Sequence, residues 1–259
     1  MRKKLFIPLA LLLVLLALSA SAVPAGDLLE GVKPDKNGNI DVLTVFPHPD
    51  DEMYCDGALL KMKTDPRVRI HLLVMTMGEL SPAKDTLGIS PEKMAEIRVK
   101  EIEKVATVLK ADSLIRWDYH DQGLPQIDKN ELAQKILKVM NQTDAEIIIG
   151  YGPEGITGHP DHIAGSQATQ IAFQKSNAQK LYYVNVPQIL YPIYRAYALT
   201  PNKPDPIPAT IKVDVRKFKK LKMFAINSHA SQKYFIGKIE QLEMSLNFNY
   251  EYFTLSASK

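Results

Sequence analysis

Apolar residues gather in five short runs along the first two thirds of the chain. Each run is rich in Val, Ile, Leu or aromatic residues and is bounded by polar or turn-forming residues, a pattern typical of buried strands. The runs lie at residues 40–46, 68–75, 113–117, 146–151 and 181–186. The segments between them are long enough for helical crossovers, and such crossovers predict that the strands pair in parallel.

The segments between these strands carry apolar residues at helical spacing. Ser90 is a good helix cap, and Pro91 follows at the first helical position, where its missing N–H does no harm. The expected helices cover residues 50–63, 91–109, 130–140 and 161–174. Beyond the fifth strand, we expect a proline-rich loop at 201–208, a strand at 211–215, and helices near 216–227 and 234–246.

Strands and helices that alternate in this way predict a single α/β domain with a Rossmann-like, doubly wound, mostly parallel sheet and helices on both faces. In the expected strand order 3-2-1-4-5, the first and fourth strands are neighbours and the order reverses between them. Ligands of such folds bind in the crevice at the carboxyl ends of these two strands. The sequence just after each of the two is therefore the place to look for chemistry.

Both of these strands run into a cluster of histidine, proline and aspartate. Residues 47–52 read Pro-His-Pro-Asp-Asp-Glu, and residues 155–162 read Gly-Ile-Thr-Gly-His-Pro-Asp-His. The prolines restrict the backbone and remove N–H donors, so the strand pattern ends there. One cluster of this kind is explained by a helix cap, but two that face each other indicate a metal site.

Imidazole and carboxylate ligands suit zinc, and a catalytic zinc keeps three protein ligands and one open position. His48, Asp51 and His162 supply such a set. Another divalent metal is the alternative ion. Asp50, next to a ligand but not needed as one, can accept a proton from water. The simpler interpretations are that Asp50 or Asp51 only caps a helix and that His159 is a loop histidine bonded to the backbone.

The two clusters resemble those of the PIG-L/LmbE-like deacetylases, the family of the N-acetylglucosaminyl-phosphatidylinositol de-N-acetylases. The resemblance rests on residues 47–52 and 158–162, in the family's order. It is reinforced by Thr-Met-Gly-Glu at 76–79, by Arg98 with Glu101, and by Ser-His-Ala-Ser-Gln at 228–232. It implies a zinc-dependent hydrolase that removes the acetyl group from an N-acetylated amino sugar, usually a glucosamine unit, and releases acetate.

The resemblance also implies roles for residues at matching positions. His48, Asp51 and His162 match the zinc ligands of the family, and Asp50 matches the general base. A base in this position takes a proton from the water that attacks the acetamide carbonyl, and such a group typically contributes about 10²–10⁴-fold to the rate.

Four further residues match family positions. His159 matches the residue that stabilises the oxyanion or protonates the leaving amine, and Asp161 matches the carboxylate that orients it. Arg98 and His229 fall where family members line the substrate pocket. The expected partner is therefore a small molecule or oligosaccharide that carries an N-acetylated amino sugar.

Two other functions fit the same residues. One is a metal-dependent amidase that acts on a different N-acyl group, such as an acylated amino acid or peptide. The other is a glycan-binding protein that keeps the fold without catalysis. The complete set of ligand and base positions favours an enzyme over a binding protein, and a substrate panel that includes both kinds of amide separates the two enzymes.

Residues 1–22 have the features of a secretion signal. Arg2, Lys3 and Lys4 precede a run of 14 uncharged residues at 5–18, and Ala-Ser-Ala follows at 20–22. Because a membrane span needs about 20 residues, we expect cleavage after Ala22 and an exported domain of residues 23–259 without a stable membrane span. An uncleaved anchor is the alternative.

The charge balance changes when this segment is removed. Lys+Arg falls from 32 to 29 against 29 Asp+Glu, so the remaining domain is close to neutral. A neutral domain does not favour nucleic-acid binding. The single cysteine, Cys55, excludes an internal disulfide, and we expect it to be a buried apolar residue of the first helix.

Overall fold

The computed structural model describes residues 23–188, 191, 207–233 and 249–259. The expected secretion signal at 1–22, most of the proline-rich loop and the expected helix at 234–246 lie outside these residues. The described strands are β1 (Ile40–Phe46), β2 (Val68–Thr76), β3 (Ser113–Tyr119), β4 (Ile147–Gly150), β5 (Lys180–Asn185), β6 (Ile211–Asp214) and β7 (Tyr250–Ser258). They form a seven-stranded sheet in the order β3-β2-β1-β4-β5-β7-β6.

The first five strands are parallel and have the predicted order, with β1 between β2 and β4. The α/β fold class is therefore confirmed. Strands β7 and β6 extend the sheet beyond β5 and run antiparallel to their neighbours. The sequence pattern indicated β6 but not β7.

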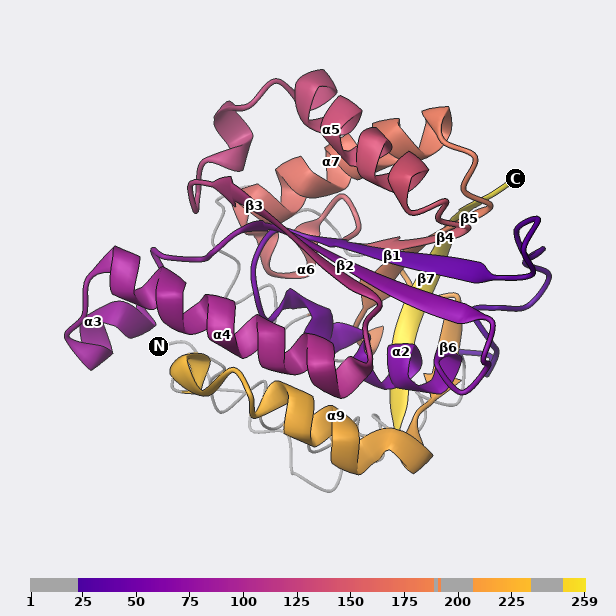
Figure 1. Ribbon diagram of the computed structural model, residues 1–259, viewed down its shortest axis with the longest axis horizontal. Helices are drawn as coiled ribbons and strands as arrows, with labels where there is room; N and C mark the ends of the chain where they lie inside the picture. The colour runs from indigo at the N-terminus through magenta and orange to yellow at the C-terminus, as the bar shows by residue number, and fades with distance from the viewer. Residues whose placement is uncertain (1–22, 189–190, 192–206, 234–248) are drawn as a thin grey trace, which may run out of the picture.

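Helices cover both faces of the sheet (Figure 1). On one face lie α2 (Asp56–Met62), α4 (Pro91–Leu109) and α9 (Lys219–Ile226), and on the other lie α5 (Lys129–Gln142) and α7 (Pro160–Lys175). Strand β1 serves both cores, because Val42 and Phe46 pack on the first face while Leu43 and Val45 pack on the second. Burial on both sides explains why this strand reads as a continuous apolar run.

The remaining described elements are short. They are η1 (Asp51–Tyr54), α3 (Ala83–Leu87), η2 (Leu124–Gln126), α6 (Gly155–Gly158), η4 (Arg216–Phe218) and η5 (Ala230–Gln232). Among the described residues, no helix is both long and apolar enough to cross a membrane.

The helix expected at 50–63 is divided in two. Asp50 has φ 97°, and Cys55, which is buried as expected, has φ −132° and ψ 5°. Neither conformation continues a helix, so a 3₁₀ turn, η1, precedes α2. The start of α4 is as predicted, because the Ser90 hydroxyl accepts the N–H of Lys93 and Pro91 follows the cap.

The N-terminus of α2 is held by a side chain from the unexpected strand β7. The Glu251 carboxylate accepts the N–H of Gly57 at 2.8 Å and that of Ala58 at 2.6 Å. The Lys222 ammonium of α9 lies 2.8 Å from the same carboxylate, and both charges are buried. A buried charge is tolerated only when it is paired and hydrogen-bonded, and the paired Glu251 fixes α2 behind the loop at 47–52.

Candidate metal centre

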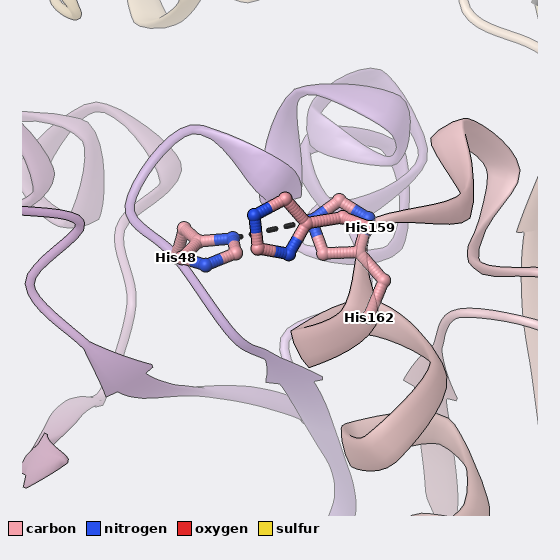
Figure 2. A group of neighbouring side chains, drawn as sticks. All are labelled: His48, His159 and His162. Carbon is pink, nitrogen blue, oxygen red and sulfur yellow. Dashed lines mark hydrogen bonds between the residues drawn. The ribbon is translucent and has the colours of Figure 1, made fainter. Parts of the chain in front are cut away.

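The two histidine clusters meet at the carboxyl edge of the sheet. β1 and β4 are hydrogen-bonded neighbours, with Val45 opposite Gly150. His48 lies in the loop after β1. His159 is the N-cap residue of α7 and His162 lies in its first turn, beyond β4 and the short α6. Figure 2 shows the three imidazole rings close together. The predicted neighbourhood of the first and fourth strands is therefore what creates the site.

The three predicted ligands present their donor atoms to one another. His48 Nδ1 lies 3.1 Å from His162 Nε2 and 3.5 Å from Asp51 Oδ2, and His162 Nε2 lies 3.3 Å from Asp51 Oδ1. Ligand atoms bound tetrahedrally at zinc distances lie about 3.3 Å apart. Burial would raise the pKa of Asp51, but His162 and His48 outweigh it and hold the pKa well below its usual range. An ionised carboxylate between two imidazoles fits a divalent ion.

The remaining polar atoms of these ligands have partners of their own. His162 Nδ1 lies 3.0 Å from the Gly155 carbonyl oxygen, which assigns the proton to Nδ1 and leaves the Nε2 lone pair free. Asp51 accepts the Tyr151 hydroxyl at 2.7 Å and the backbone N–H of His48 at 2.8 Å. Outer partners of this kind orient metal ligands in proteins.

A second set of three donors, all of them imidazole nitrogens, exists at the same place. Ring nitrogens of His48, His159 and His162 also lie within 4.8 Å of one another. His159 differs from the other two in its partner, because its Nδ1 accepts the backbone N–H of Asp161 at 3.2 Å. The neutral ring must then carry its proton on Nε2. Burial, with His48 and His162 nearby, lowers the pKa of His159 to about 4, so it is a neutral hydrogen-bond donor beside the site.

Asp161 contacts a different histidine from the one expected. Its carboxylate lies 3.2 Å from His48 Nε2 and accepts the backbone N–H groups of Gln122 and Leu124 at 2.7 and 3.1 Å. Only its backbone bonds to the His159 ring. The orientation of His159 by the Asp161 carboxylate stays a prediction, and the observed histidine contact of this carboxylate is with His48. The carboxylate is fully buried, so its orientation is fixed.

Asp121 also contacts the site, although the sequence pattern did not predict it. Its Oδ1 lies 3.1 Å from His48 Nε2, and its other oxygen accepts the N–H of Leu80 at 3.0 Å. In the sequence it reads only as the first residue of an Asp-Gln-Gly turn. The usable signal was its position just after β3, on the same edge of the sheet as the two clusters. Asp121 and Asp161 together hold the Nε2 side of His48 and leave Nδ1 facing Asp51 and His162.

Replacing Asp121 by asparagine should weaken metal binding by about 10–100-fold, the usual effect of removing an outer carboxylate. The amide keeps the size of the side chain but not the charge that supports His48. Asp118→Asn is the matched control, since Asp118 is exposed and lies three residues away. Competition with a chromogenic chelator measures both affinities. Equal metal affinity in the Asp121 variant and the wild type would refute this role.

Asp50 lies next to the predicted ligands but has a different partner. Its carboxylate lies 2.8 Å from Arg98 Nη2, and its side chain is 18% exposed. Burial raises the pKa of Asp50 to about 6, despite the nearby Arg98 charge, which acts to lower it. A carboxylate that titrates near neutral pH is well suited to accept and release a proton.

Both loops of the site have strained backbone. Asp50 and Ile156 have φ of 97° and 53°, in the left-handed region that non-glycine residues rarely adopt. Gly155 also has positive φ, and a Cβ there would lie 2.8 Å from the Cβ of His162. Strained conformations persist where the surroundings enforce them, and they cluster at functional sites.

The two residues expected to contact substrate are buried. Arg98 is 4% exposed and His229 is 1% exposed. His229 Nε2 lies 2.5 Å from the Glu52 carboxylate, behind the loop at 47–52. Substrate contact by Arg98 and His229 stays a prediction. Both side chains contact the loop at 47–52, and Arg98 also contacts Gly78.

Comparisons with known proteins identify chains of similar sequence and fold. Residues 43–173, half of the chain, match the family model described as GlcNAc-PI de-N-acetylase, PIG-L. A probable N-acetyl-alpha-D-glucosaminyl L-malate deacetylase 2 of Bacillus anthracis is 30% identical over 207 residues, which cover 78% of this chain and 84% of that protein.

Two solved structures show the same fold at low sequence identity. An N,N'-diacetylchitobiose deacetylase from Pyrococcus horikoshii aligns with a TM-score of 0.62 at 19% identity and covers 87% of each chain. A 4-carboxy-2-hydroxymuconate hydratase from Pseudomonas putida aligns with a TM-score of 0.64 at 14% identity, over 85% of this chain and 97% of the other. The fold thus carries more than one reaction, whereas the family model and the Bacillus relative decide the membership: this chain belongs to the GlcNAc-PI de-N-acetylase (PIG-L) family.

Proposed function

We propose that this protein is a zinc-dependent hydrolase that removes the acetyl group from an N-acetylated amino sugar. The observation that carries the proposal is the convergence of His48, Asp51 and His162 beside Asp50, in a chain of a de-N-acetylase family. The named reactions of the relatives, on a glucosaminyl malate and on diacetylchitobiose, support a glucosamine unit as the acetylated sugar.

The donor set fits the chemistry that amide hydrolysis needs. His48, Asp51 and His162 would hold a divalent ion, which would supply a Lewis acid able to acidify water and polarise a carbonyl. Asp50 takes the proton from the attacking water. Its pKa of about 6 leaves it ionised at neutral pH and still basic enough to do so.

His159 acts on the other side of the reaction. Its Nε2–H, assigned by the bond that Nδ1 accepts from Asp161, donates to the carbonyl oxygen as that oxygen gains negative charge. The loss of one such donor typically lowers the rate by about 10²–10³-fold. The proton that Asp50 took from water passes to the amine nitrogen, the C–N bond breaks, and acetate and the free amino sugar are released.

Acetate release from a panel of amides tests the proposal. The panel contains N,N'-diacetylchitobiose, an N-acetylglucosaminyl malate, N-acetylglucosamine and several N-acetyl amino acids. Zinc-loaded protein should release acetate and free amine in equal amounts from at least one sugar, and chelation should stop the release until zinc is returned. Release from the amino acids alone would support the alternative amidase, and binding of a sugar without release would support the glycan-binding alternative.

Export of the domain at residues 23–259 is also proposed, on the features of residues 1–22. It would bring the enzyme to extracellular or cell-wall glycans. Protein that keeps its first 22 residues and stays inside the cell on fractionation would contradict the export.

A further inference from the structure

The Arg98 side chain is buried at the centre of the contacts around the loop at 47–52. Its guanidinium donates to the carbonyl oxygens of Pro49 and, at 3.0 Å, Gly78, and it lies 2.8 Å from the Asp50 carboxylate. A guanidinium is planar and always charged, so it fixes the direction of every group it binds. Arg98 therefore holds both the backbone just before Asp50 and the carboxylate of Asp50 itself.

The conformation of Asp50 is one that needs such support. Its φ of 97° is unfavourable for a residue with a Cβ. Asp50 is also the N-cap residue of η1, but its side chain makes no capping hydrogen bond to that turn. Strain of this kind persists only where the surrounding structure enforces it. Charge-assisted bonds to buried groups are among the stronger interactions available for this.

The neighbouring loop is built to admit Arg98. Gly78, in the Thr-Met-Gly-Glu segment at 76–79, has φ 62°, and a Cβ at this position would overlap the Arg98 guanidinium. The glycine is therefore required for two reasons, its positive φ and the close approach of the arginine. Gly78 and Arg98 act as one unit, although they lie in different segments of the chain.

The opposite side of the loop is fixed independently. Glu52 accepts the backbone N–H of Asp50 at 3.0 Å and lies 2.5 Å from His229 Nε2. Glu101, one helical turn beyond Arg98 on α4, accepts the backbone N–H and the hydroxyl of Ser231, both at 2.7 Å. The segment at 228–232 thus braces both the loop and α4, so a change at Arg98 acts on a loop that remains anchored elsewhere.

We propose that Arg98 is a positioning residue that holds the Asp50 carboxylate in its reactive orientation. This inference rests on the proposed role of Asp50 as the base. The groups that Arg98 binds engage its Nη1 and Nη2, whereas its buried Nε has no hydrogen-bond partner among the described residues.

Steady-state kinetics with a released-acetate assay tests the inference on zinc-loaded protein. Arg98→Ala should lower kcat by about 10²-fold, the effect of a misplaced catalytic group, and leave KM and bound zinc unchanged. Millimolar guanidinium should restore part of kcat, because it refills the space beside Asp50. Arg116→Ala, at an exposed arginine, is the control and should match the wild type.

A double-mutant cycle covers the case in which Arg98→Ala misfolds. Gly78→Ala forces the guanidinium away from its site, so it should lower kcat in the wild-type background. The same substitution should lower kcat much less in the Arg98→Lys background, because the single ammonium of lysine cannot make the same set of bonds. Equal effects of Gly78→Ala in both backgrounds would overturn the inference.

The other outcomes separate this inference from the proposed function. A raised KM with unchanged kcat in Arg98→Ala would show substrate contact and overturn the positioning role. Unchanged kcat in Arg98→Ala would also overturn it. If Asp50→Asn nevertheless loses the activity of the wild type, the proposed function still stands. Full activity of Asp50→Asn would instead refute the base assignment on which the inference rests.

Discussion

Replacing Asp50 by asparagine should lower kcat by about 10²–10⁴-fold, the usual contribution of a general base, while the protein keeps its metal. Asparagine preserves the size of the side chain and can still accept a hydrogen bond from Arg98, but it cannot take a proton from water. The donor atoms of His48, Asp51 and His162 are left in place. Acetate release and zinc content, measured on the same preparation, separate these two effects.

Asp118→Asn is the matched control for this substitution, because Asp118 is an exposed aspartate outside the site. It should leave both turnover and zinc content at the wild-type level. Zinc loss in Asp50→Asn would show that Asp50 is a ligand, and unchanged turnover would show that another group accepts the proton.

Replacing His162 by alanine should abolish tight zinc binding and, with it, turnover. The substitution removes one of three donors and also the ring that stacks on Tyr151, 4.2 Å away between centroids. The loss should exceed the about 10–100-fold expected for an outer partner such as Asp121. Zinc at about 100 times its Kd stabilises a folded protein by about 2.7 kcal/mol, so a zinc-dependent rise in Tm should occur in the wild type and be absent in this variant.

His159→Ala is the informative comparison, since His159 lies in the same cluster but bonds to the backbone of Asp161. It should keep zinc and the zinc-dependent rise in Tm, yet lose turnover. Loss of zinc in His159→Ala, with zinc retained in Asp51→Ala, would assign the metal to the trio of histidines instead.

Strands β1, β2, β4 and β5 could be predicted from the sequence, because parallel strands covered on both faces leave continuous apolar runs. The order of the strands, and with it the meeting of the two clusters, followed from the doubly wound fold class. Strand β7 could not be predicted. It contains Glu251, which a sequence pattern counts as exposed, and this carboxylate is buried only because Lys222 and the first amides of α2 satisfy it. Those partners lie far away in the chain.

The predicted ligands could be identified from the sequence, but the residues that hold the ligands and Asp50 in place could not. His48, Asp51 and His162 stand in short motifs at strand ends, where spacing alone carries information. Asp121 belongs to a third loop, and its contact with His48 depends on how that loop folds over the sheet edge. The break at Asp50 likewise depends on Arg98, 48 residues further on, and no local helix signal reports it.

Anomalous diffraction at the zinc edge, from crystals of the zinc-loaded protein, tests the central claim most directly. We expect one strong peak bonded to His48 Nδ1, the Asp51 carboxylate and His162 Nε2, with Asp50 beside it and not bonded to it. A peak bonded to His159 in place of Asp51, or one that lies away from all three predicted ligands, would contradict the proposed centre.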